Sequence, residues 1–305
     1  SAFAANTTAD NNTAIGYQAL NANTTGADNT AVGKGAHAIS TTATKNVAIG
    51  VDSLNACTNG SSNTAVGWNA LKLNTTGSSN VAVGYRALDA STTGTNCVAV
   101  GDDALGANTT ASYNTAVGYH AVDANTTGAN NTGIGYEALG ANTTADSNTG
   151  VGAYALYSNS TGASNVALGQ GALQNNTTAD NNTACGKNAL VLNTTGTSNV
   201  AVGALSLDAN TTGNQNIAVG KNALGGNTEG DGNTAVGHGS IPVATTATYN
   251  TGCGYHTLLT TTTGGGNTAI GAWALDANTT GANNVAVGGG ALGENTTAGG
   301  NTAVG

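Results

Sequence analysis

A five-residue pattern of polar and apolar positions recurs along the whole chain with a strict period of 17 residues. The first copy covers Asn12–Gly16 and the last covers Asn301–Gly305, which makes eighteen copies without an insertion or deletion between them. A period of this length, held over the chain, is typical of a solenoid in which each repeat is one coil stacked on its neighbours. The period therefore predicts a single continuous repeat domain over residues 1–305.

The five positions have distinct characters. Position 1 is Asn in every copy except one, where Cys97 replaces it, position 2 is Thr, Val or Ile, and position 4 is mostly Val or Ile. Position 3 is Ala or Gly, and position 5 is always Gly, which we expect to adopt an unusual backbone angle. Alternation rich in β-branched residues and ended by Gly predicts a short β-strand, with Val or Ile of position 4 pointing into the coil.

The remaining twelve positions predict a second apolar residue that points into the coil and a tight turn, which we call the corner. Position 9 is Leu in fourteen of seventeen coils, with His37, Val122 and Ile241 as the exceptions, and we expect this residue on a second short strand. Positions 12 to 15 read Asn-Thr-Thr-Gly in many coils, which is typical of a tight corner. Stacked coils would align the Asn of position 1 and the Thr of position 13 into polar ladders. The predicted structural residues are Gly16, Gly33, Gly67 and Gly118 (position 5), Asn63 and Asn114 (position 1), Leu71 and Leu139 (position 9) and Thr126 (position 13).

The fold class that follows is all-β, a parallel β-solenoid or β-roll of about eighteen 17-residue coils. If position 4 points inward, position 3 points outward, yet it holds only Ala or Gly. Solvent would not impose that limit, whereas a neighbouring chain packed against the strand would. This restriction predicts a homo-oligomer or fibre.

Composition and charge exclude several classes of partner. The chain contains only six Lys and Arg residues and has a net charge of −9, so it cannot form the basic track that nucleic acid requires. No apolar run approaches the ~18 residues of a membrane span, so we expect no membrane insertion in this segment. The chain begins inside one coil and ends on the Gly of another, and we interpret it as a fragment of a longer fibre protein.

The sequence offers little catalytic or metal-binding chemistry. The four Cys residues occupy positions 12 (Cys57), 1 (Cys97) and 4 (Cys185 and Cys253), and each is interpreted as an unpaired, small buried residue, which mildly favours assembly in a reducing compartment. No Cys or carboxylate recurs beside the four His residues, and the acidic pair Asp102 and Asp103 is interpreted as a solvated turn. We therefore expect no enzyme activity, no catalytic residue, no metal and no cofactor.

Aromatic residues recur at position 6 and are the only candidate binding residues. Exposed aromatic side chains at intervals along a solenoid could bind sugars or apolar surfaces, although covering the Gly corner of the next coil is the favoured explanation. The candidates are Tyr17, Trp68, Tyr85, Tyr119, Tyr136 and Tyr255.

The copies at 46–50, 80–84, 199–203 and 284–288 read Asn-Val-Ala-Ile-Gly or Asn-Val-Ala-Val-Gly. They resemble the repeat of trimeric autotransporter adhesin heads of the YadA type and related repeats of phage and bacterial tail fibres. This resemblance implies a left-handed parallel β-roll, a homotrimer, and an extracellular location at a cell surface or on a virion. The adhesin-head coil is shorter by about three residues, so the Asn-Thr-Thr-Gly corner is more similar to the tail-fibre variants.

Together these features predict a non-enzymatic structural fibre, the shaft or head of a surface adhesin or tail fibre that mediates attachment. Its expected partners are other copies of itself, with host surfaces or glycans as further candidates. The alternative is an ice-binding β-solenoid in which Thr residues at positions 13 and 14 order water. A flat strand is the usual place for an ice-binding face, which favours the fibre.

Overall fold

The computed structural model describes residues 1–305 and contains strands and turns but no helix. The chain forms two compact units, Ser1–Asn148 and Thr149–Gly305. The strands of the first unit are β1 (Thr13–Ile15), β2 (Thr30–Val32), β3 (Val47–Ile49), β4 (Thr64–Val66), β5 (Val81–Val83), β6 (Val98–Val100), β7 (Thr115–Val117) and β8 (Thr132–Ile134). The strands of the second are β9 (Thr149–Val151), β10 (Val166–Leu168), β11 (Thr183–Cys185), β12 (Val200–Val202), β13 (Ile217–Val219), β14 (Thr234–Val236), β15 (Thr251–Cys253), β16 (Thr268–Ile270), β17 (Val285–Val287) and β18 (Thr302–Val304).

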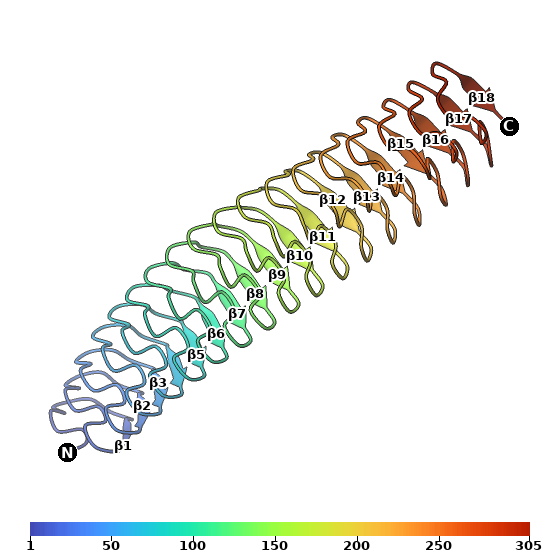
Figure 1. The fold of residues 1–305 in the computed structure, drawn as a ribbon. Helices are drawn as coiled ribbons and strands as arrows, with labels where there is room; N and C mark the ends of the chain where they lie inside the picture. Colours follow the sequence, from blue (N-terminus) through green and yellow to red (C-terminus); the bar gives the residue numbers. More distant parts are fainter. The chain divides into compact units, whose positions relative to one another are not determined.

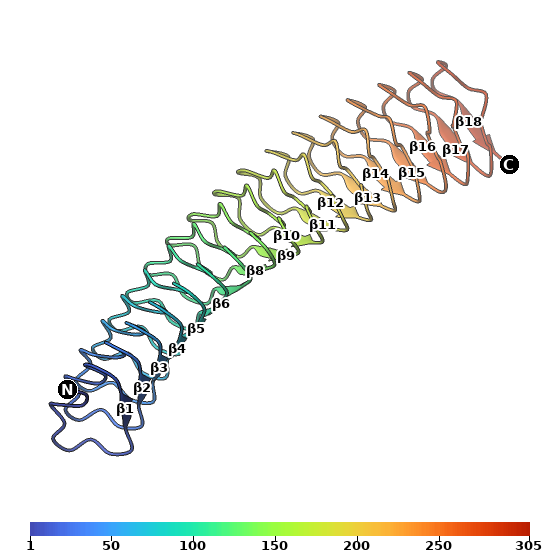
Figure 2. The ribbon, with the colours of Figure 1, turned by 60° about the horizontal axis from the view of Figure 1, so that its bottom comes forward.

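Each unit is a parallel β-solenoid with a strict 17-residue register. Thr64 pairs with Val81 in the first unit and Val200 pairs with Ile217 in the second, so each position faces the same position of the next coil. Within each unit, one side of every coil carries the strand and the other sides are turns (Figures 1 and 2). The predicted fold class is therefore confirmed, while the single continuous domain and the left hand of the coil stay predictions. No helix of the chain could cross a membrane.

The strand faces the core with the opposite side from the one predicted. Ala65 and Ala116 at position 3 are fully buried, whereas Val66 and Val117 at position 4 are partly exposed. The prediction that position 4 points inward is wrong, and so is the inference that position 3 meets a neighbouring chain. Ala and Gly occupy position 3 because the interior of the coil has no room for a larger side chain.

Two compensating pairs show which residues limit that room. Where position 9 holds Val122, position 3 of the next coil is Gly133, and a Cβ there would lie 2.5 Å from Cγ2 of Val122. Where position 9 holds Ile241, the next coil has Gly252, whose Cβ would lie 2.9 Å from Cγ1 of Ile241 and 2.6 Å from the hydroxyl oxygens of Ser240 and Thr257. A β-branched side chain at position 9 thus replaces the methyl group that Ala contributes elsewhere. Positions 3 and 9 pack against each other across a thin core.

Position 9 lies inward as predicted but not on a second strand. Leu71 and Leu139 are completely buried, and their φ angles are 51° and 55°. Left-handed angles recur at positions 7, 9 and 17 of the coils, so turns occupy the part where a second strand was expected. A left-handed Leu is uncommon, and its cost is offset by burial of the side chain in the core.

The Gly residues of position 5 have the unusual backbone angles that were predicted. The φ angles of Gly16, Gly33, Gly67 and Gly118 are 126°, 136°, 138° and 137°. A Cβ on Gly118 would also lie 2.8 Å from the carbonyl carbon of Gly135 in the next coil. Position 5 therefore requires Gly for its backbone angle and for the close approach of successive coils.

Two rows of buried Asn side chains hold the coils in register. The Asn63 backbone N–H donates to Oδ1 of Asn46 in the preceding coil at 2.9 Å, and Asn114 Nδ2 donates to the Gly128 carbonyl at 2.8 Å. The Asn of position 12 forms a second row, which was not predicted. Asn125 Nδ2 donates to Oδ1 of Asn108 in the preceding coil at 3.0 Å. These bonds satisfy polar groups that water cannot reach.

The predicted Thr ladder is also present, with a backbone acceptor. Thr126 Oγ1 at position 13 donates to the carbonyl oxygen of Thr143 in the next coil at 3.0 Å. Thr75 makes the same bond to the Thr92 carbonyl at 2.9 Å. The hydroxyl groups of position 13 therefore link neighbouring coils.

One buried side chain breaks the apolar pattern of position 9. His37 is fully buried, and neither ring nitrogen has a hydrogen-bond partner. Burial lowers the pKa of His37 from 6.5 to about 4. The unfolded chain binds a proton near pH 6.5 while the folded chain does not, so stability is complete above that pH and is lost as the pH falls toward 4.

We therefore expect the free energy of unfolding to fall by about 2 kcal/mol between pH 7 and pH 5 through His37 alone. The variant His37→Leu should lack this pH-dependent loss of stability. It should also be more stable than wild type at pH 7, because Leu fills the same position in most coils. Urea unfolding of both proteins at the two pH values measures the difference. Equal losses of stability in the two proteins would contradict the assignment.

Candidate functional site

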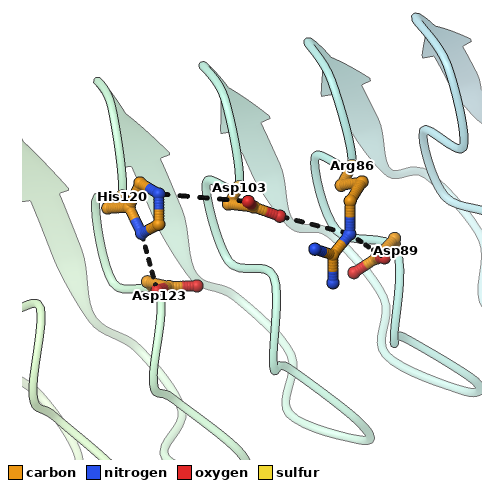
Figure 3. A network of polar contacts seen from close by, with 5 residues as sticks. All are labelled: Arg86, Asp89, Asp103, His120 and Asp123. Atoms are coloured by element: carbon orange, nitrogen blue, oxygen red, sulfur yellow. Dashed lines mark hydrogen bonds and ion pairs between the residues drawn. The ribbon is translucent and has the colours of Figure 1, made fainter.

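A cluster of charged side chains lies on one side of the first unit, outside the strands. Arg86, Asp103 and His120 all occupy position 7 of consecutive coils, directly after β5, β6 and β7. Asp89 and Asp123 occupy position 10 and lie beside this row (Figure 3). Because the coils stack in register, residues 17 apart in the chain become neighbours. We call these five residues the polar cluster.

The contacts of the polar cluster run continuously from coil to coil. Arg86 Nε lies 2.9 Å from Asp89 Oδ2 and 3.4 Å from Asp103 Oδ1. His120 Nδ1 lies 2.8 Å from Asp123 Oδ2, and His120 Nε2 lies 3.9 Å from the other carboxylate oxygen of Asp103. Asp103 therefore lies between a guanidinium group and an imidazole ring (Figure 3).

Burial and charge act in opposite directions within the polar cluster. The side chain of Asp103 is only 17% exposed, and its burial raises its pKa although the charge of Arg86 lowers it. The hydrogen bond from Arg86 to Asp89, together with the negative charge of that carboxylate, raises the pKa of Arg86. Asp102 and Asp103 lie in a turn as interpreted, with Asp102 exposed and Asp103 partly exposed.

The polar cluster borders an open pocket of about 520 Å³. Ala90, Gly106 and Ala107 form part of its lining beside the charged side chains. Gly106 at position 10 and Ala90 and Ala107 at position 11 leave space between the coils, and Leu73 and the side chains of position 7 border that space. The chain holds no group of three His, Cys, Asp or Glu residues that could bind a metal ion.

Four of the aromatic candidates of position 6 lie in these coils or the adjacent ones and form two stacked pairs. Trp68 and Tyr85 stack with ring centroids 5.0 Å apart, and Tyr119 and Tyr136 stack at 5.4 Å. The Tyr119 ring also lies 4.1 Å from the ring of His120, centroid to centroid, which joins this row to the polar cluster. All four aromatic side chains are between 44% and 48% exposed.

The other two aromatic candidates lie apart from this group. Tyr17 is 62% exposed at the start of the chain, in the coil of β1. Tyr255 belongs to the second unit, where it stacks on His256 at 3.9 Å and contacts Trp273 edge-on at 5.4 Å. The structure therefore brings four of the six candidates into two stacked pairs on the first unit, with the coil of Asp102 between the pairs.

A second exposed feature is the outer side of the strands, which we call the strand face and define as positions 2 and 4 of every coil. It contains only Thr, Val, Ile, Leu and Cys, with no charged residue in any of the eighteen strands. In the second unit Val219 and Val236 are 36% and 37% exposed. Cys253 at position 4 is exposed and unpaired, so the interpretation of this Cys as buried is wrong.

Sequence reasoning missed the polar cluster because it looked for residues that recur. Position 7 is variable, and in three consecutive coils it holds three different residues, Arg86, Asp103 and His120. Only their spacing of 17 residues indicates that they contact one another. No protein-family model matches the chain, and no curated protein matches it.

Proposed function

We propose that this chain is a non-enzymatic structural fibre segment whose copies associate through the strand face. The observation that supports this proposal most strongly is the composition of that face. The chain has a net charge of −9, yet positions 2 and 4 carry no charge in any strand. Two copies can therefore meet at this face without burying like charges, whereas other sides of the coil carry Asp and Glu.

The side chains of the strand face also suit burial against an identical surface. Its two rows are mostly β-branched and stand in register from coil to coil, as in the pairing of Val202 with Val219. Exposed apolar patches bordered by polar residues often mark protein interaction sites. Burial of these rows between copies would remove apolar area from water and stabilise the assembly.

The resemblance of the repeat to adhesin heads and tail fibres supports a trimer and a role in attachment. In this proposal the solenoid units serve as the shaft or head of a surface adhesin or tail fibre, outside the cell or on a virion. The chain would act as a scaffold rather than as an enzyme.

The self-association of the chain tests this proposal. We expect wild-type protein to sediment as an oligomer, with a trimer as the specific expectation. The double variant Val219→Lys and Val236→Lys should shift it toward the monomer, because two adjacent strands of the strand face would then carry buried charge. Sedimentation equilibrium measures both masses.

A matched control uses an exposed Val away from the strand face. Val243 at position 11 is 42% exposed, and Val243→Lys should leave the oligomer unchanged. A wild-type chain that sediments as a monomer at every concentration would overturn the assembly proposal. An oligomer that survives the double variant would mean that the copies meet through another side.

An ice-binding solenoid is the second candidate function, and one observation favours it. Thr residues of position 2, such as Thr115 and Thr132, lie on the exposed strand face in parallel register. Threonine at position 13 is less suited, since its hydroxyl donates to a carbonyl of the next coil. Thermal hysteresis of the purified chain separates the two candidates, because the fibre proposal expects none.

A further inference from the structure

We infer that the pocket beside the polar cluster binds a neutral sugar of a glycan chain. This inference rests on the attachment role in the proposed function and names the ligand class for that role. It does not depend on assembly through the strand face, because the pocket is lined by positions 7, 10 and 11.

The unused hydrogen-bonding groups of the pocket match the hydroxyl groups of a sugar. Arg86 contacts Asp89 and Asp103 through Nε alone, which leaves the two terminal nitrogens of its guanidinium group as donors. Asp123 contacts His120 through Oδ2, and its Oδ1 is a further acceptor. A hydroxyl both donates and accepts, and bonds to charged groups are stronger than those between neutral ones. Two adjacent hydroxyl groups of one sugar could therefore hydrogen-bond at the same time, one to the Asp123 carboxylate and the other to the Arg86 guanidinium group.

The shape of the pocket suits a ring with one apolar face. Leu73, Ala90 and Ala107 give the pocket an apolar part, against which the C–H face of a pyranose can pack. Tyr119 contacts His120 at the border of the polar cluster, so an aromatic side chain is available beside the pocket. A volume of about 520 Å³ lies within the ~300–1,000 Å³ of typical ligand pockets and is large enough for one or two sugar rings.

The charges of the polar cluster argue against other ligand classes. Asp89, Asp103 and Asp123 outnumber Arg86 and would repel a phosphate or an acidic sugar. Arg86 already pairs with Asp89 and Asp103, so a cationic ligand would compete with its guanidinium group for these carboxylates. A neutral polyhydroxylated ring avoids both conflicts.

The test is binding of the purified chain to an array of immobilised neutral, acidic and amino-sugar oligosaccharides. We expect neutral oligosaccharides to bind, and titration calorimetry with the strongest of them gives the affinity. Asp123→Asn should weaken binding at least tenfold by removing a charged acceptor. Ala90→Phe should do the same by filling the pocket without changing its charge.

Asp276→Asn is the matched control, because Asp276 occupies position 10 in the second unit and should leave binding unchanged. The inference is overturned if no neutral oligosaccharide binds, if only acidic or amino sugars bind, or if both pocket variants bind like wild type. Sedimentation of the same samples separates the two proposals. An oligomer without sugar binding contradicts only the pocket, whereas a sugar-binding monomer contradicts only the assembly.

Discussion

Leu139→Ala should lower the free energy of unfolding by ~2–5 kcal/mol, the usual cost of a cavity at a fully buried Leu. Leu139 has no exposed surface. The residue of position 9 is the one large apolar side chain that its coil contributes to the core. The neighbouring coils cannot close the space without breaking the register that their Asn ladders hold. Chemical unfolding of the variant, followed by circular dichroism, measures the loss.

The matched control for this substitution is Leu192→Ala. Leu192 lies at position 11 and is 47% exposed, so its truncation should change stability by no more than ~0.5 kcal/mol. Similar effects of the two substitutions would mean that position 9 does not form the core.

Gly118→Val should destabilise the chain by on the order of 3–5 kcal/mol, since two separate costs add. A φ of 137° is strained for any residue with a side chain, and the new Cβ would lie 2.8 Å from the carbonyl carbon of Gly135. The backbone of the next coil would have to move, and such movement would disturb the parallel pairing of β7 and β8. Thermal unfolding of the variant beside wild type measures the cost.

Gly289→Val provides the comparison for Gly118→Val. A Cβ at Gly289 would have only the Ala272 carbonyl oxygen as a neighbour within 4 Å, at 3.8 Å. This variant should unfold within a few degrees of wild type. If it were as unstable as Gly118→Val, crowding between coils would not explain the Gly of position 5.

The sequence was sufficient to predict the coil, its strand and much of its bonding. A period of 17 residues fixes the parallel register, and Asn63, Thr126 and Gly118 recur at positions where only a few side chains satisfy the backbone. Such local requirements appear directly as a repeated residue type. The ladders of position 1 and position 13 could therefore be predicted from the repeat alone.

The side of the strand that faces the core could not be predicted from hydrophobicity alone. Position 3 and position 4 are both apolar, and the larger residue was expected to point inward. The volume of the coil decides otherwise, since Leu71 and the small residues around it already fill the interior. The pairs Val122 with Gly133 and Ile241 with Gly252 carry this information in the sequence, but they are recognisable only once positions 3 and 9 are known to meet.

The polar cluster was beyond sequence reasoning for a different reason. A repeat pattern identifies the residues that all coils have in common. The polar cluster consists of residues that differ from one coil to the next. Arg86, Asp103 and His120 form contacts only because three consecutive coils carry long polar side chains at position 7. Small residues at neighbouring positions, such as Gly106, leave the space that makes a pocket.

The central claim, assembly through the strand face, is tested most directly by the native thiol on that face. In a Cys185→Ser background, Cys253 is the one accessible Cys, because Cys57 and Cys97 are buried. A short thiol-specific cross-linker should then join copies of the chain into covalent dimers, and the Val236→Lys substitution on the adjacent strand should abolish them. Absence of cross-linking in the Cys185→Ser protein, with Cys253 modified equally fast with and without Val236→Lys, would contradict assembly through this face.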